Sequence, residues 1–201
     1  LVPAKNILTT YTPPVGLAYV AGSLLEAGFE LNFIDGLGES MDTRHPWDND
    51  TFIHGLSLEQ IVDRVPKSVG MIGVHAGFSF DWPMCRTLIN LIRERFPNVS
   101  LIGGGEHVTA VPEECFKESS LDVIVCGEGE ETAVEIAKAV RDGNAIAESI
   151  DGIVFRSRDG SFVKTQPRAR LTDIDNIAPP AWSIMPIHQY LDRGFGLGVN
   201  R

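Results

Sequence analysis

Hydrophobic residues form two patterns along the chain. Short apolar runs alternate with longer segments in which apolar residues recur every three or four positions. Residues 15–27 have this helical spacing between a Pro-Pro pair and a Gly, and residues 31–35 read as a short buried strand. Pro at the entrance of a helix and Gly beyond its end are typical of helix boundaries. Before this helix the pattern is ambiguous and places a first strand at Leu1-Val2 or at Ile7-Leu8-Thr9.

The alternation breaks at residues 36–55, which we expect to be an irregular surface excursion, and resumes beyond it. Ser57 and Gln60 are spaced as a helix capping box. The apolar run 70–76 predicts a central strand buried on both faces. Asp81 is placed to cap the next helix, in which one apolar stripe is formed by Cys85, Leu88, Ile89, Ile92 and Phe96.

Strands at 99–102 and 123–126 follow, with a short helix from residue 112 between them and a helix at 130–142 after them. The buried face of the last helix is expected to contain Ala133, Ile136, Ala137 and Val140. Short strands that alternate with helices predict an α/β fold, a parallel sheet covered by helices on both faces. Right-handed crossovers would place all strand-to-helix loops at one edge, where such folds bind ligands. The loops are residues 10–16, 75–81, 103–111 and 127–132.

The chain changes character after residue 148. An Asp-Gly pair between two β-rich runs predicts a hairpin, and a Pro-Pro pair at 179–180 begins an irregular tail. We therefore expect a binding domain at 1–148, a hairpin appendage at 149–167 and an extended linker at 168–201.

Charge and composition narrow the class of protein. Lys and Arg total 17 against 27 Asp and Glu, a net charge of −10, which argues against nucleic-acid binding. A hydrophobic content of 43% excludes a wholly disordered chain, and no apolar run approaches the roughly 18 residues of a membrane span. Three cysteines without C-x-x-C spacing suit reduced, buried thiols in the cytoplasm. The chain lacks both a signal peptide and an initiator Met, so we expect a piece of a longer protein.

The loop residues disfavour a nucleotide. Val108 stands where a dinucleotide fingerprint needs its third Gly, and no phosphate-binding G-x-x-x-x-G-K-[ST] segment occurs. The acids of the last loop either suit the positive end of a helix or accept hydrogen bonds from ligand amides. His75 and His107 are either ligand contacts or ordinary loop-end residues. Tyr11 either stacks on a flat ligand or packs beneath the Pro-Pro turn.

Taken together, these segments resemble the cobalamin (B12)-binding N-terminal domain of cobalamin-dependent radical S-adenosylmethionine (SAM) enzymes. The similar segments are PPVGLAYVA (13–21), GGGEHVT (103–109) with PEE (112–114), VCGEGEET (125–132), the Asp-Gly pairs at 151 and 159, and DID (173–175) with PPAW (179–182). They occur in the family's order over residues 13–192.

The resemblance implies a flavodoxin-like (Rossmann-like) domain with a parallel five-stranded sheet, which holds cobalamin at the carboxyl ends of the strands. His75 departs from the Ser-rich loop that often lines the cofactor's tail in the family. The implied cofactor contacts are Tyr11, Pro14, Val15, Gly16, His75, Gly77, Phe78, Ser79, Gly103, Gly104, Gly105, Glu106, His107, Val108, Thr109, Gly127, Glu128, Gly129, Glu130 and Glu131.

Two absent motifs refine this expectation. Proteins of the D-x-H-x-x-G type replace the cofactor's own base with a histidine, and this chain has no such motif. We therefore expect base-off cobalamin without a histidine ligand, its lower face toward Tyr11 or Val15. The C-x-x-x-C-x-x-C motif, which holds a [4Fe-4S] cluster for SAM, is also absent. The resemblance thus implies a non-catalytic domain that presents cobalamin to a radical SAM domain of the same polypeptide.

The parent enzyme is expected to be a methyltransferase acting on an unactivated carbon or phosphorus centre. A non-methylating radical SAM enzyme would use the same domain. A stand-alone cobalamin sensor and an empty α/β scaffold are the alternatives from other classes.

Overall fold

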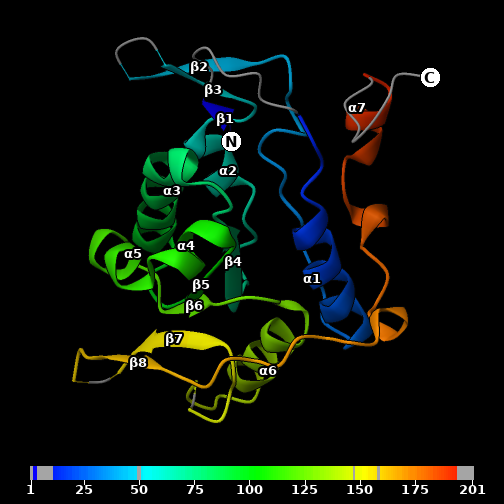
Figure 1. The fold of residues 1–201 in the computed structure, drawn as a ribbon. Coiled ribbons are helices and arrows are strands. Elements are labelled where there is room, and N and C mark those ends of the chain that lie inside the picture. The colour runs from blue at the N-terminus through cyan, green and yellow to red at the C-terminus, as the bar shows by residue number, and fades with distance from the viewer. Residues whose placement is uncertain (1, 4–10, 49–50, 147, 158, 194–201) are drawn as a thin grey trace.

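The computed structural model describes residues 2–3, 11–48, 51–146, 148–157 and 159–193. The strand considered at Ile7-Leu8-Thr9, the loop residues 49–50 and the end of the linker lie outside this part of the chain. The fold is an α/β sandwich in which helices cover both faces of a central sheet (Figure 1). None of the helices in the described ranges is long and apolar enough to cross a membrane.

The central sheet has five strands in the order β4 (Met71–His75), β5 (Ser100–Gly104), β6 (Val123–Val125), β7 (Ile153–Arg156) and β8 (Phe162–Lys164). The first three run parallel, whereas β7 is antiparallel to β6 and to β8. The predicted Rossmann-like α/β class is confirmed. The sheet is mixed rather than wholly parallel, because the predicted hairpin forms and hydrogen-bonds to β6. The domain boundaries at 148 and 167 stay predictions.

Two strand predictions differ from the structure. Residues 31–35 form no strand, although Asp35 at their end is buried. Strand β4 is an end strand among the described residues, and its side chains are half-buried or exposed rather than buried on both faces. Both errors have one cause, since a short apolar run specifies neither a strand nor the number of its neighbours.

The predicted surface excursion at 36–55 is also wrong in part. It contains β2 (Arg44–Asp48) and β3 (Thr51–His54), which pair antiparallel, and β3 pairs with β1 (Val2–Pro3) in a second, three-stranded sheet. The register shifts between Pro46 and Asp48. A Pro and a bulge are tolerated at a sheet edge, but in sequence they look like a loop.

One face of the central sheet carries the larger core. It is covered by α2 (Leu58–Asp63), α3 (Trp82–Arg95), α4 (Glu106–Ala110) and α5 (Pro112–Glu118), seen together on one side of the sheet in Figure 1. The capping box of α2 is confirmed, because the Ser57 hydroxyl accepts from the Gln60 amide at 3.2 Å and the Gln60 side chain accepts from the Ser57 amide at 2.8 Å. The predicted stripe of α3 faces this core.

Asp81 precedes α3 as predicted, but its side chain does not cap the helix. A short 3₁₀ helix, Ser79–Asp81, runs directly into α3 and gives Asp81 helical backbone angles. A capping side chain needs an extended backbone to reach the amides of the first turn, so the carboxylate of Asp81 points elsewhere.

The opposite face is covered by α6 (Glu130–Arg141), and α1 (Val15–Glu26) packs on α6. Ala133, Ile136 and Ala137 are buried as predicted, whereas Val140 is half-buried. Strand residues alternate between the faces, so Ile102 meets Ile136 on this side.

The chain beyond the hairpin folds back along α1 (Figure 1). It contains 3₁₀ turns at Ile174–Asn176 and Trp182–Ile184, and helix α7 (Ile187–Leu191). The Ala181 amide donates to the Ala18 carbonyl at 2.9 Å, and a Cβ on Gly22 would come within 2.1 Å of the Pro179 carbonyl oxygen. The linker therefore docks on α1.

A buried hydrogen bond holds the last described helix of this docked segment, α7, on the domain. The Tyr190 hydroxyl donates to Asp35 Oδ2 at 2.7 Å, and the Gly38 amide donates to Asp35 Oδ1 at 2.8 Å. Burial and the neighbouring carboxylate raise the pKa of Tyr190, which stays a neutral donor.

Replacing Tyr190 with Phe leaves Asp35 Oδ2 without this donor in a buried setting. The free energy of unfolding is expected to fall by about 1–3 kcal/mol, as measured by urea denaturation. Tyr19→Phe on the half-buried flank of α1 is the control and should be close to neutral. Equal stability of Tyr190→Phe and wild type would contradict a structural role for this contact.

Candidate cobalamin site

Three of the four predicted loops meet at the carboxyl ends of β4, β5 and β6. The Ala76 amide donates to the Gly104 carbonyl at 2.7 Å, and the His107 amide donates to the Ala76 carbonyl at 3.2 Å. The Gly127 amide donates to Thr109 Oγ1 at 3.4 Å, which joins the second loop to the third. The parallel strands thus gather these loops at one edge, as the crossover rule predicts.

Gly105 lets two of these loops touch. Its φ is +120° and its ψ is 173°, a conformation essentially restricted to Gly. A Cβ here would lie 2.6 Å from the Ala76 carbonyl oxygen and 3.1 Å from the Gly77 amide nitrogen. Gly105 therefore sets the spacing of the two loops.

Of the described glycines that border open space, four lie in or next to the predicted loops or on the sheet face beside them. Within the described part of the chain, a Cβ on any of them would meet no atom within 4 Å; these open glycines are Gly16, Gly73, Gly104 and Gly127. The register pairs His75 with Gly104, so Gly73, His75 and Gly104 share the sheet face on which Met71 packs toward α1 and α6. A large ligand can approach the backbone here without meeting a side chain.

The glycines of the Gly-Gly-Gly run at 103–105 have different surroundings. Gly103 points to the other face, where a Cβ would meet Leu121 Cδ1 at 2.7 Å. Val108 is fully buried in the core under α3, away from the open glycines. Of this run, Gly104 presents the open backbone.

His75 and His107 both lie at this edge. A Cβ on Gly77 would lie 2.8 Å from His75 Nε2, so the missing side chain of Gly77 makes room for the exposed His75 ring. His107 Nδ1 is hydrogen-bonded to Ser79 Oγ at 3.0 Å, and its ring packs on Trp82 with centroids 4.9 Å apart. Burial lowers the pKa of His107, which favours the neutral imidazole near pH 7.

Unsatisfied polar atoms concentrate in these loops. Among the described residues, buried side-chain atoms without a hydrogen-bond partner include Asp81 Oδ1, His107 Nε2 and Glu130 Oε2, one from each loop. Such atoms are rare in folded proteins and indicate a missing partner. A ligand with amide groups would supply donors to the two carboxylate oxygens.

Burial raises the pKa of Asp81 to about 6. Between pH 3.8 and about 6 the folded chain therefore binds more protons than the unfolded chain, and its stability falls as the pH rises through this window. Asp81→Asn should remove this fall and stabilise the chain at pH 7 by about 1–3 kcal/mol. Urea denaturation across the window measures the effect, with the exposed Asp175→Asn as control. An unchanged slope in Asp81→Asn would refute the assignment.

Aromatic side chains stand at the end of β4. Phe78 and Phe80 stack with centroids 5.4 Å apart, yet Phe78 is 62% and Phe80 is 45% exposed. Two exposed, stacked phenyl rings provide an apolar contact for a flat ligand.

The remaining predicted loop, residues 10–16, reaches this region through α1. Val15 and Gly16 begin α1 after Pro14 and are exposed, and Val20 one turn later lies 3.1 Å from the position of a Cβ on Gly129. Tyr11 contacts a different region.

The Tyr11 hydroxyl is hydrogen-bonded to His54 Nδ1 at 2.7 Å. Its ring packs against the cluster of Leu37, Met41 and Tyr190. Both interpretations of Tyr11, stacking on a flat ligand and packing beneath the Pro-Pro turn, stay predictions.

Glu128 and Glu131 contact the linker. Glu128 Oε2 accepts from the Leu171 amide at 2.9 Å, and Glu131 pairs with Arg168 at 3.0 Å. Glu106 is exposed in the first turn of α4. The acids of the third loop therefore have separate surroundings, and of these described acids Glu130 is the one with a buried oxygen that lacks a hydrogen-bond partner.

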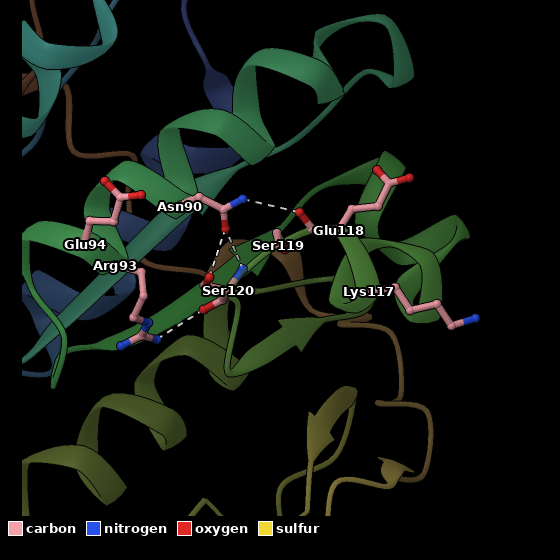
Figure 2. A pocket seen from close by; sticks show the side chains of 7 residues that line it. All are labelled: Asn90, Arg93, Glu94, Lys117, Glu118, Ser119 and Ser120. Atoms are coloured by element: carbon pink, nitrogen blue, oxygen red, sulfur yellow. Dashed lines mark hydrogen bonds between the residues drawn. The ribbon is translucent and has the colours of Figure 1, made fainter.

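A surface hollow of about 440 Å³ lies at the other edge of the sheet. Figure 2 shows its lining residues, which come from the second half of α3, the end of α5 and the turn after it: Asn90, Arg93, Glu94, Lys117, Glu118, Ser119 and Ser120. Asn90 Oδ1 accepts from the Ser120 amide and hydroxyl, and Arg93 donates to the Ser120 carbonyl. Its central polar groups thus satisfy one another, unlike those of the three loops.

Sequence reasoning missed four residues at this site, one of which, Asp81, was predicted only as a helix cap. Gly73 interrupts an apolar strand, a pattern typical of close backbone approach. Phe80 repeats Phe78 at a spacing of two. Arg168 had no detectable signal, because its partners lie more than thirty positions earlier in the chain.

The mixed sheet, the loops at its carboxyl edge and the open glycines define a Rossmann-like ligand-binding domain. A sequence model of the B12 binding domain family matches residues 6–137, which include all three loops. The chain belongs to the B12-binding domain family.

Enzymes of known activity are similar over most of the chain. The cytidylyl-2-hydroxyethylphosphonate methyltransferase of Streptomyces wedmorensis is 31% identical over 179 residues, 87% of this chain and 33% of the relative. An anaerobic magnesium-protoporphyrin IX monomethyl ester cyclase of Synechocystis sp. is 29% identical over 89% of this chain and 33% of the relative. The chain thus spans about a third of the length of these relatives.

Solved structures share the fold at low sequence identity. The cobalamin-dependent SAM radical enzyme OxsB with aqua-cobalamin bound has a TM-score of 0.70 at 16% identity, over 94% of this chain and 24% of OxsB. The radical SAM methyltransferase TsrM of Kitasatospora setae, with cobalamin and a [4Fe-4S] cluster bound, has a TM-score of 0.63 at 19% identity, over 87% of this chain and 30% of TsrM.

Proposed function

We propose that the chain binds cobalamin at the edge formed by the three loops and presents it to a radical SAM domain of the same polypeptide. The observation that carries the proposal is the set of open glycines, which leaves backbone free for a broad corrin ring. Asp81 Oδ1 and Glu130 Oε2 would accept hydrogen bonds from the amide groups around the ring. Phe78 and Phe80 would exclude water from its margin.

The residues of this chain would hold cobalamin base-off and without a histidine ligand. The absence of a D-x-H-x-x-G motif from the sequence supports this view. His54 is engaged by Tyr11. Val15 at the start of α1 offers an apolar side chain rather than a nitrogen to the lower face of the ring.

Electron paramagnetic resonance of the chain loaded with cob(II)alamin tests both parts of the proposal. A nitrogen ligand on cobalt splits each cobalt line, whereas a weak oxygen ligand does not. We expect no nitrogen splitting. Splitting that changes when the histidines carry heavy nitrogen would show a protein ligand, and splitting that does not change would show the cofactor's own base. Either result would refute the base-off, histidine-free proposal.

The parent enzyme is proposed to be a radical SAM methyltransferase with a [4Fe-4S] cluster and SAM in its catalytic domain. Similarity to the phosphonate methyltransferase supports this interpretation. When bound, cobalamin would supply the methyl group. The cyclases are similar over as much of the chain, and they favour a non-methylating parent as the second candidate. Transfer of an isotope-labelled methyl group from SAM to the product would separate the two.

We also propose that the chain works in the cytoplasm. Its described cysteines are free, and Cys85 and Cys115 are buried. Burial raises the pKa of Cys85 to about 11 and that of Cys115 to about 12, which keeps both thiols protonated and unreactive. Free thiols of this kind suit a reducing compartment.

A further inference from the structure

Arg168, at the start of the linker, gathers side chains from the first two turns of α6. Its guanidinium donates to Thr132 Oγ1 at 2.7 Å, to Glu131 Oε2 at 3.0 Å and to Glu135 Oε2 at 2.5 Å. The Arg168 side chain is only 13% exposed. A fork of donors that is nearly buried and reaches three acceptors is a specific contact rather than a surface ion pair.

A second contact joins the same two segments. The Leu171 amide donates to Glu128 Oε2 at 2.9 Å. Glu128 precedes Gly129 and Glu131 follows it, so the linker holds the third loop on both sides of its central glycine. A Cβ on Gly152 would lie 3.2 Å from the Arg168 Cβ, so the linker also packs closely on the turn before β7.

These contacts bear on the position of the third loop. Glu128, Glu130, Glu131 and Glu135 place four carboxylates at the start of α6, and Arg168 pairs with two of them. Without Arg168 these carboxylates would repel one another, and the loop would lose its contacts on the linker side. Gly127 has a φ of +85° and no Cβ to restrict its backbone, so the loop depends on its neighbours for its conformation.

We propose that Arg168 is a positioning residue, which couples the third loop of the cobalamin site to the docked linker. Binding of cobalamin and docking of residues 168–171 then stabilise each other, because coupling between two sites is reciprocal. This inference rests on the proposed function. It adds that the linker docks more firmly on the domain when cobalamin is bound.

Equilibrium binding of hydroxocobalamin to the full 201-residue chain tests the first half of the coupling. Arg168→Ala should weaken binding about tenfold, within the usual range of coupling between sites. Glu135→Gln, outside the loop, should weaken it about threefold, and Arg168→Lys should restore part of the loss. Arg170→Ala is the matched control, since Arg170 is exposed in the same segment, and should bind within about twofold of wild type.

Hydrogen exchange of the linker amides tests the second half. Hydroxocobalamin should slow exchange of residues 168–171 in wild type and in Arg170→Ala, but not in Arg168→Ala. A merely structural role for Arg168 would speed exchange in the free protein without changing the response to cobalamin. Circular dichroism confirms that each variant is folded, and Glu135→Gln replaces Arg168→Ala if the latter is not.

The outcomes separate the two proposals. If wild type binds hydroxocobalamin and both Arg168→Ala and Glu135→Gln bind as tightly as Arg170→Ala, the coupling is refuted and the cobalamin site stands. The coupling is also refuted if cobalamin leaves linker exchange unchanged in wild type. If wild type does not bind hydroxocobalamin, the proposed function fails, and the coupling fails with it.

Discussion

Replacing Gly105 with Ala is expected to lower the free energy of unfolding by about 3 kcal/mol, the largest loss of stability among the glycine substitutions considered. Two costs combine at this position. The backbone angles of φ +120° and ψ 173° are strained for any residue with a Cβ. The new methyl group would also lie 2.6 Å from the Ala76 carbonyl oxygen, on backbone that cannot rotate away. Urea denaturation of the purified variant measures the change.

Gly143→Ala separates these two costs. Gly143 follows α6, has a φ of +68° and has no atom within 4 Å of a Cβ in the described structure. Only the backbone cost applies there, and a loss of about 1 kcal/mol is expected. If Gly105→Ala were no less stable than Gly143→Ala, the close approach of the two loops would be wrong.

Replacing Gly104 with Leu is expected to weaken hydroxocobalamin binding at least about 100-fold, equivalent to roughly 2.7 kcal/mol. The Leu side chain would enter the open space beside Gly104, where the ring is proposed to lie. The fold should survive, because the added side chain meets no protein atom within 4 Å of its Cβ in the described structure. Retained absorbance after desalting measures binding, and thermal unfolding checks the fold.

Gly70→Leu is the matched control for this substitution. Gly70 is exposed at the amino end of β4, and a Cβ there makes ordinary contact with Val140 at 3.9 Å. Binding should be unchanged in this variant. Equal affinity of the Gly104 and Gly70 variants would place the ligand away from the three loops.

Local patterns in the sequence predicted the elements well where neighbouring residues determine them. The capping box at Ser57 and the stripe of α3 depend only on positions a few residues apart, and both were confirmed. All five segments of the sheet were predicted to be strands, but β7 and β8 were predicted as a hairpin outside the sheet, and the end position of β4 was not predicted. Strand order depends on distant partners, and an apolar run does not specify them.

The loops of the candidate site were predicted as segments, but not the function of each residue. Successive residues of a strand face opposite sides, so Gly103 packs toward Leu121 while Gly104 faces open space. Gly105 then leaves the strand and contacts Ala76. In sequence the three glycines are indistinguishable.

Contacts between distant segments could not be predicted. Tyr190 and Asp35 are 155 positions apart, and Arg168 and Thr132 are 36 apart. Both pairs exist because the linker folds back on the domain, whereas the sequence of the linker indicates only an irregular, extended segment.

The site proposal depends on a backbone surface that has no side chains of its own and is free to receive a corrin. Mixing the purified chain with hydroxocobalamin, desalting it and recording the visible spectrum is the most direct test. We predict that the protein fraction keeps the corrin absorbance at about one equivalent per chain. A colourless protein fraction, from a chain that is folded by circular dichroism, would contradict this account.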